Sequence, residues 1–356
     1  MSDDDPLALA SGGSCPLPFR EYPHVLLAHG GGGSLTSQLI ETLFLAELKN
    51  PALEVLHDGA LLDVNGARLA FSTDSYVVRP LFFPGGDIGS LAVHGTVNDL
   101  AMCGARPVAL SSAFLLEEGF PMEDLRRIVR SMRDAAAAVG VPVVTGDTTV
   151  VDRGKGDGVF VNTAGIGLVA DGIDVSPRRA RPGDAILVSG SIAEHGIAVM
   201  SVREGLEFET TLTSDSAPLW SLVERLLSAC GTGVHVLRDP TRGGVASALN
   251  EIAAQAKVGI RIDERAIPVR EEVRGACEIL GFDPLYVANE GKCLAFVDRK
   301  EAGAALAALR SDPLGSGAAI IGEVVDEHPG RVHLRSLSGG MRIVDMLSGE
   351  QLPRIC

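Results

Sequence analysis

The chain has 356 residues, of which 46% are hydrophobic and 22% charged, and this length predicts about two domains. It carries 31 Lys and Arg against 46 Asp and Glu, a net charge of −15. No basic run interrupts this balance, which argues against nucleic acid as a partner. No apolar stretch approaches the ~18 to 20 residues of a membrane-spanning helix, so no membrane is expected. The acidic start, Met1 to Asp5, is unlike a signal peptide and predicts a cytoplasmic protein.

The first half of the chain alternates predicted helices with predicted strands. Apolar residues recur at helical spacing over 35–48 and 122–139, and Gly140 ends the second of these helices. Apolar alternation or continuous apolar runs predict strands over 67–78, 141–145 and 159–169. Such an order is typical of an α/β or α+β fold.

A second α/β domain is predicted after an irregular stretch rich in Pro and Arg. The chain then divides into a flexible tail over 1–22, a first domain over 23–170, a linker over 171–184, a second domain over 185–335 and a mobile tail over 336–356. The second domain is predicted to hold helices over 192–203, over 219–228 and after Gly244, and strands over 185–189, 294–297 and 319–325. Fully extended, the last segment would reach roughly 70 Å at ~3.3 Å per residue, enough to carry its end into a distant pocket.

Carboxylates stand beside glycine and hydroxyl residues at four places in the first half. They are Asp74 between Thr73 and Ser75, Asp87 after two glycines, Asp99 after Asn98, and Asp147 between Gly146 and Thr148. Mg²⁺ that also holds phosphate oxygens prefers such ligands. An aspartate beside glycine is also a common turn former, and spacing alone leaves both interpretations open.

This chain lacks the usual phosphate-binding loop. No G-x-x-x-x-G-K-[ST] motif occurs and lysines are scarce, so metal ions, arginine and backbone amides would have to neutralise a triphosphate. The Thr241-Arg242-Gly243-Gly244 turn at a helix start offers such amides. It could equally be a plain glycine-rich helix entry.

Cysteine, glutamate and histidine supply the remaining candidates for chemistry. The six cysteines include no C-x-x-C pair, which argues against a zinc cage or a disulfide framework. Cys356, the last residue of the sequence, is either a nucleophile or an inert thiol. Glu290 and His94 are candidate proton-transfer groups, with a solvated glutamate and a structural histidine as the alternatives.

Taken together, several segments resemble the HypE family, the carbamoyl dehydratases of [NiFe]-hydrogenase maturation. This family belongs to the PurM-like ATP-binding proteins related to aminoimidazole ribonucleotide synthetase. The resemblance covers nearly the whole chain, and the ending Pro353-Arg354-Ile355-Cys356 is specific to this branch. The other matching segments are Leu27 to Gly30, Thr73 to Val78, Phe82 to Gly89, Gly95 to Met102, Val144 to Thr148, Asn162 to Gly167 and Asp239 to Val245.

The resemblance implies a homodimer in which the first domains pair their sheets into a β-barrel. ATP and Mg²⁺ would lie in a groove between the two domains. The partner HypF would carbamoylate Cys356, and the tail would bring the thiocarbamate to ATP, where dehydration gives a thiocyanate. The HypC–HypD complex would then accept the cyanide.

The resemblance also implies roles for single residues. Cys356 would carry the reacting group, and Glu290 would act as a base toward the nitrogen proton. Asp74, Asp99 and Asp147 would hold metal, and these three with Asp87, Asn98, Thr148 and Arg242 would bind the nucleotide.

One position departs from the family pattern, which reads Gly-Asp-Thr-Lys-Val-Val. This chain has Thr149 where the family has lysine, and that lysine is thought to work with the glutamate in deprotonation. Three alternatives stay open: another cation takes the place of the lysine, a water relay carries the proton, or dehydration is impaired in this variant. An impaired site would leave a thiol carrier or scaffold, and a third hypothesis is an ATP-dependent synthetase or kinase that acts on a free small molecule.

Overall fold

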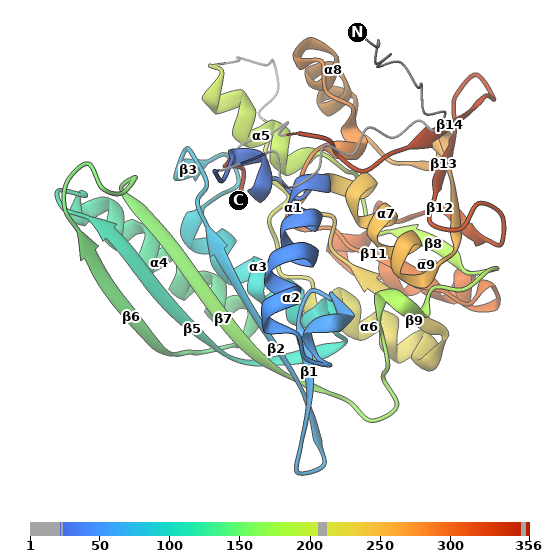
Figure 1. The fold of residues 1–356 in the computed structure, drawn as a ribbon, viewed down its shortest axis with the longest axis horizontal. Coiled ribbons are helices and arrows are strands. Elements are labelled where there is room, and N and C mark those ends of the chain that lie inside the picture. The colour runs from blue at the N-terminus through green and yellow to red at the C-terminus, as the bar shows by residue number, and fades with distance from the viewer. Residues whose placement is uncertain (1–21, 23, 206–211, 350–353) are drawn as a thin grey trace, which may run out of the picture.

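Two β-sheets with helices packed on them organise the computed structural model, which describes residues 22, 24–205, 212–349 and 354–356 (Figure 1). The predicted N-terminal tail over 1–22 lies almost wholly outside the described residues. In the part of the chain that the structure describes, no helix has the length and apolar character to cross a membrane.

The first sheet has five strands in the order β1-β2-β7-β5-β6. Its elements are β1 (Ala60–Val64), β2 (Ala67–Tyr76), β5 (Ala105–Glu117), β6 (Val143–Val151) and β7 (Val159–Val169), with a small hairpin of β3 (Phe82–Phe83) and β4 (Gly86–Asp87). Neighbouring strands run antiparallel except β5 and β6, which are parallel. Helices α3 (Ile88–Met102) and α4 (Met122–Val139) bury one face, with a core that includes Leu91, Ile128 and Met132.

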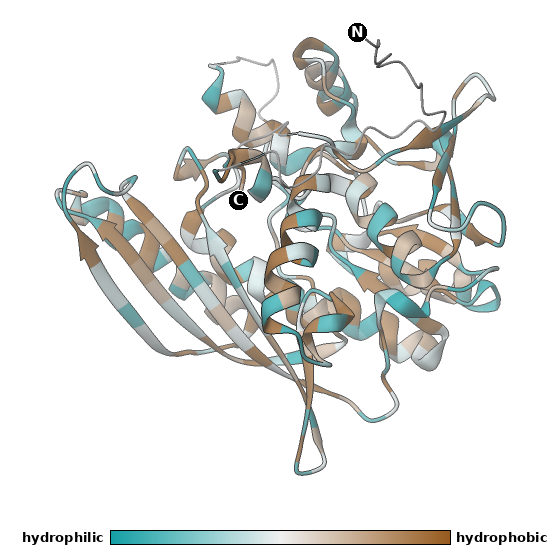
Figure 2. Cartoon of the chain, in the orientation of Figure 1, coloured by the Kyte–Doolittle hydropathy of each residue, from teal (hydrophilic) through white to brown (hydrophobic). Residues whose placement is uncertain are grey.

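The other face of the first sheet is open. It exposes large apolar side chains, among them Phe71 at 43% and Ile166 at 42% of their surface. Figure 2 shows hydrophobic residues along these strands.

The predicted helix over 35–48 is present, with an irregularity in its middle. It consists of α1 (Ser34–Leu39), the π-helical turn η3 (Ile40–Phe44) and α2 (Leu45–Leu48). Short 3₁₀ turns occur at Leu27–Gly30, Leu53–Val55, Pro177–Arg179, Gly231–Gly233, Glu264–Ala266, Pro284–Tyr286, Arg299–Glu301 and Pro313–Gly315.

The second sheet has seven strands in the order β14-β13-β10-β12-β8-β11-β9. They are β8 (Ala185–Val188), β9 (Val234–Arg238), β10 (Gly259–Asp263), β11 (Leu294–Val297), β12 (Ala319–Val325), β13 (Val332–Arg335) and β14 (Met341–Val344). One face packs on α5 (Glu194–Arg203), α7 (Gly244–Ala256) and α8 (Glu271–Leu280). On the other face, α6 (Trp220–Cys230) and α9 (Ala302–Arg310) cover the half of the sheet that contains β8, β11 and β9.

Helix α3 joins the two domains, and the sequence did not reveal it. Its residues are almost all buried and mostly small or apolar, so it lacks the polar face that marks a surface helix. Gly95 lets β2 approach closely, because a Cβ there would lie 2.0 Å from the Tyr76 hydroxyl oxygen. The last segment also differs from expectation, since Met341–Val344 pairs with β13 instead of being irregular.

Asp87 caps the start of α3. Its carboxylate accepts hydrogen bonds from the Gly89 and Ser90 N–H groups at 2.8 and 3.0 Å. Asp87 thus caps a helix within the chain, and its expected part in nucleotide binding stays a prediction.

We expect Asp87→Ala to lower the free energy of unfolding by about 1 kcal/mol, because two helical N–H groups lose their acceptor. Asp87→Asn keeps an acceptor oxygen and should lose less than half as much. Urea unfolding of both variants measures the difference, and equal losses would contradict the capping role.

Candidate active site

The segment around Cys356 is inserted between the two domains. The Val77 N–H donates to the Cys356 carbonyl at 3.3 Å, and the Arg79 N–H donates to the Arg354 carbonyl at 3.1 Å. Both donors follow β2, so the segment lies along the backbone just beyond the end of that strand. The Cys356 residue is only 5% exposed. The structure therefore buries a residue that the sequence singled out as unlikely to fill a core.

Three predicted residues surround the Cys356 thiol. Arg242 pairs with Asp74 at 3.6 Å, and its charge opposes the burial that raises the pKa of the thiol. The Glu290 carboxylate lies close enough to the thiol to raise its pKa further. Burial outweighs the arginine, so the inserted thiol is neutral and is a poor nucleophile where it lies.

Glu290 is buried at 3% exposure among other acids. Burial, followed by repulsion from Asp239, Asp74 and Asp215, raises the pKa of its carboxyl well above the usual range. A carboxylate with a raised pKa is a stronger proton acceptor than a solvated one, which suits the predicted role of a base.

Asn98 fixes the loop that carries Glu290. Its amide nitrogen donates to the Glu290 carbonyl at 3.2 Å and the Ala217 carbonyl at 3.0 Å, and its oxygen accepts from the Leu219 N–H at 2.8 Å. These contacts make Asn98 a residue that positions the base, and its expected contact with the nucleotide stays a prediction.

Asp215 and Lys292 hold the same loop from its other side. The Glu290 N–H donates to Asp215 at 3.1 Å, and the Lys292 ammonium lies 3.2 Å from Asp215 and 3.3 Å from Glu194. The lysine thereby brings a buried positive charge close to the candidate base.

Three further carboxylates converge beside this group. Oxygens of Asp58, Asp99 and Asp239 all lie within 4.8 Å of one another. Burial and mutual repulsion raise the pKa of Asp99 well above the usual range and raise that of Asp239 to about 8. Asp58 Oδ2 is buried with no hydrogen-bond donor among the described residues, while Oδ1 pairs with Arg238 at 2.8 Å. This donor set fits a hard divalent cation such as Mg²⁺.

Sequence analysis missed two members of this carboxylate cluster. Asp239 was quoted only within the matching segment Asp239 to Val245, and Asp58, which precedes Gly59, was not considered. Asp58 stands beside a glycine, as Asp87 and Asp147 do, and this neighbour was the signal that could have identified it.

The glycine-rich segment after His29 packs on the turn at Arg242. A Cβ on Gly32 would lie 2.6 Å from the Arg242 carbonyl oxygen, and Gly32 has a φ of +73°. The two glycine-rich segments thus meet at the start of α7, where backbone N–H groups can bind an anion.

Asp147 and Thr148 do not join the site within one chain. Asp147 on β6 pairs across the sheet with Ala113 on β5, which pairs with Asn162 on β7, which in turn pairs with Ser75 on β2. Three strand spacings, or about 14 Å, therefore separate Asp147 from β2. By strand alternation, Asp147 and Thr149 project from the open face and Thr148 from the helix-covered face. Of the three predicted metal ligands, the structure brings together Asp74 and Asp99 only.

The comparisons identify the family. Models for AIR synthase related proteins match residues 56–169 as the N-terminal domain and 181–335 as the C-terminal domain. A carbamoyl dehydratase HypE from Rhizobium leguminosarum bv. viciae is 56% identical over 93% of this chain and 94% of its own length. The chain belongs to the HypE family of carbamoyl dehydratases.

Solved HypE structures agree in fold. The crystal structure of a HypE–HypF complex matches with a TM-score of 0.83 at 50% identity, covering 87% of this chain and 99% of that one. HypE in complex with ATP matches with a TM-score of 0.79 at 52% identity, covering 94% and 100%. The expected two-domain PurM-like α/β fold and the expected membership among the ATP-dependent carbamoyl dehydratases are confirmed, while the β-barrel stays a prediction.

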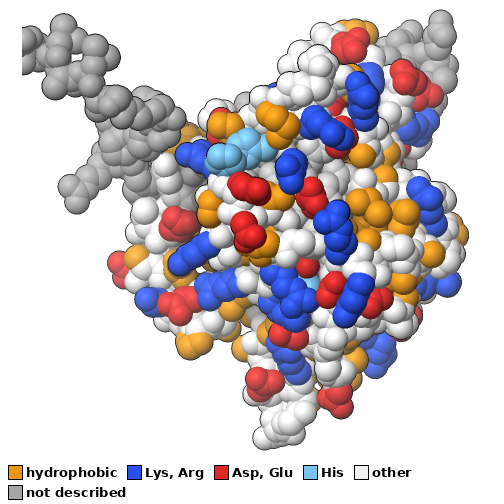
Figure 3. Space-filling view, turned by 90° about the vertical axis from the view of Figure 1, so that its right-hand side faces the viewer, with side chains coloured by type: hydrophobic (Ala, Val, Ile, Leu, Met, Phe, Trp, Pro, Cys, Tyr) orange, Lys and Arg blue, Asp and Glu red, His pale blue; other side chains and the backbone are white. Residues whose placement is uncertain are grey.

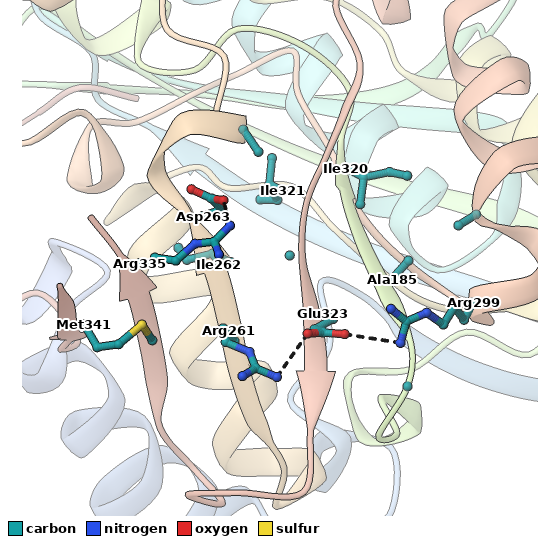
Figure 4. A pocket seen from close by; sticks show the side chains of 14 residues that line it. Ala185, Arg261, Ile262, Asp263, Arg299, Ile320, Ile321, Glu323, Arg335 and Met341 are labelled. Carbon is teal, nitrogen blue, oxygen red and sulfur yellow. Dashed lines mark hydrogen bonds and ion pairs between the residues drawn. The ribbon is translucent and has the colours of Figure 1, made fainter. Parts of the chain in front are cut away.

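A cavity lies on the second sheet, on the half that α6 and α9 do not cover. It has a volume of about 710 Å³ and is lined by β10, β12 and β13. Arg261 and Arg299 both pair with Glu323 there (Figure 4). The surface on this side mixes acidic and basic side chains (Figure 3). Because these charges are already paired, this cavity is a poorer triphosphate site than the glycine-rich turn at Arg242.

His94, a candidate proton-transfer group, contacts Ser216 with 3.0 Å between Nδ1 and Oγ. Burial lowers the pKa of His94 to about 4. Below pH 6.5 the unfolded chain binds a proton that the folded chain does not bind until about pH 4. Stability is therefore lost as the pH falls through this window.

We expect His94→Gln to flatten the pH dependence of the free energy of unfolding between pH 6.5 and 4. One proton accounts for a slope of at most about 1.4 kcal/mol per pH unit. Urea unfolding at several pH values checks this, and an unchanged slope would show that His94 is charged in the folded protein.

Proposed function

We propose that this protein dehydrates the S-carbamoyl group of its own Cys356 to a thiocyanate, using ATP. The observation that carries the proposal is the burial of Cys356 beside Glu290 and Arg242, next to the carboxylate cluster. A synthetase or kinase that acts on a free small molecule would not need its own thiol at that point.

The chemistry needs an activated oxygen and a base. An amide oxygen leaves poorly, and ATP, when bound, supplies a phosphoryl group that makes it a good leaving group. The oxygen then departs as phosphate, both nitrogen protons are lost and the C≡N bond forms. Glu290 accepts a nitrogen proton, and Arg242 stabilises negative charge at the thiocarbamate and phosphate. Asp58, Asp99 and Asp239, with Asp74 nearby, would hold the Mg²⁺ that neutralises phosphate oxygens.

A homodimer accounts for the open face of the first sheet. Apolar side chains such as Phe71, Leu115 and Ile166 are exposed there and would be buried against a second copy. Asp147 and Thr149 lie on the same face, so a partner sheet that closes the barrel would receive them. This arrangement would give Asp147 a role that it lacks within one chain.

Two partners complete the proposal. HypF would load the carbamoyl group, which the structure of a HypE–HypF complex from a relative at 50% identity supports. A HypC–HypD complex would accept the cyanide for the hydrogenase iron.

We expect intact mass spectrometry after incubation with HypF, carbamoyl phosphate, ATP and Mg²⁺ to show a carbamoyl adduct that then loses one water. Cys356→Ala should show neither species. An adduct that keeps its water would leave a thiol carrier, and Thr149→Lys would then tell whether the missing lysine is the cause.

We expect Asp239→Asn to weaken Mg²⁺-dependent ATP binding at least tenfold, on the order of one lost metal ligand. Asp312→Asn is the matched control, because Asp312 is also buried but caps a 3₁₀ turn and pairs with Arg225, outside the carboxylate cluster. Calorimetric titration with and without Mg²⁺ measures both, and equal losses in the two variants would remove Asp239 from the metal site.

A further inference from the structure

His195 on α5 contacts the backbone of the inserted segment. Its Nε2 lies 2.8 Å from the Ile355 carbonyl oxygen, one residue before the thiol-bearing Cys356. The histidine is completely buried, and its ring meets the Phe83 ring edge-on with 5.4 Å between centroids.

The hydrogen bonds around His195 fix its tautomer. A carbonyl only accepts, so Nε2 must carry the proton and donate to Ile355. The Ser216 N–H donates to Ser214 Oγ at 3.0 Å, and that oxygen lies 2.8 Å from His195 Nδ1. The Ser214 hydroxyl therefore donates to Nδ1. Burial lowers the pKa of His195, which keeps the ring in this neutral form.

Arg203, at the other end of α5, makes a parallel contact. Its guanidinium donates to the Arg354 carbonyl at 2.9 Å and to the Arg79 carbonyl, with Nε at 3.1 Å from the latter. Second-domain side chains thus hold one side of the inserted segment, and the backbone at Val77 and Arg79 holds the other.

Cys356 cannot be carbamoylated while its segment lies inserted between the two domains. A transferase must reach the Cys356 sulfur and needs it as a thiolate. The inserted thiol is buried and neutral. Contacts that hold the inserted segment, including those to the Arg354 and Ile355 carbonyls, would therefore oppose carbamoylation and favour dehydration.

We propose that His195, oriented by Ser214, is a positioning residue that recognises the Ile355 peptide carbonyl and holds Cys356 at Glu290. The expected effect on dehydration rests on the proposed function. The contact between His195 and Ile355, and the first test below, do not depend on it.

The first test measures alkylation of Cys356 by iodoacetamide in the full chain, with peptide mapping to separate it from the other cysteines. We expect His195→Ala to raise the rate about two- to tenfold, the effect of one lost hydrogen bond. His195→Gln should restore most of the protection, because its amide N–H can reach the same carbonyl.

His235→Ala is the matched control. His235 is also buried in the second domain, where it pairs with Asp184 at 2.8 Å and does not touch the inserted segment. Its loss should lower stability without changing the Cys356 alkylation rate. An unchanged rate in His195→Ala, or an equal increase in His235→Ala, would overturn the proposal.

The second test follows the HypF-loaded protein. In His195→Ala, carbamoylation should be at least as fast as in wild type while dehydration slows, whereas a merely damaged protein slows in both steps. If alkylation responds as expected but even the wild type keeps the water of its adduct, the proposed function fails and the positioning contact stands.

Discussion

The site depends on carboxylates of like charge that are buried close together. Asp58, Asp99 and Asp239 face one another. Asp74 raises the pKa values of Asp99 and Asp239 further, and Asp239 and Asp74 raise that of Glu290. Repulsion between such groups is poorly screened away from water, so bound protons or a cation must balance it. Helix α3 makes the arrangement possible, because it packs on the first sheet and also on α6 and β9 of the second domain.

The predictable parts of the fold are those with a periodic pattern. Helix 122–139 and strands 159–169, 294–297 and 319–325 were predicted with the bounds that the structure has, because one face of α4 is polar and the strands are short apolar runs between turns. Helix α3 gave no such pattern, because small residues let it be buried on all sides. The long strand β5 was missed as well, since Pro107 near its start reads as a break.

The site was predicted in part. Cys356, Glu290, Arg242, Asp74 and Asp99 were named from motifs, and the fold gathers them. Asp58 and Asp239 were missed because their role arises only when a loop and a strand end meet across the domain boundary. Asn98 and Asp87 were named as nucleotide-binding residues, and the structure shows that they also hold the base loop and a helix start, which their motifs did not indicate.

The inserted segment also ties the two domains together mechanically. Its backbone bonds to Val77 and Arg79 on one side and to side chains of α5 on the other. Separating the domains breaks one of these two sets of bonds, so insertion couples the unfolding of one domain to that of the other. The cooperativity of unfolding therefore depends on whether the Cys356 segment is inserted, as well as on the contacts between the two domains.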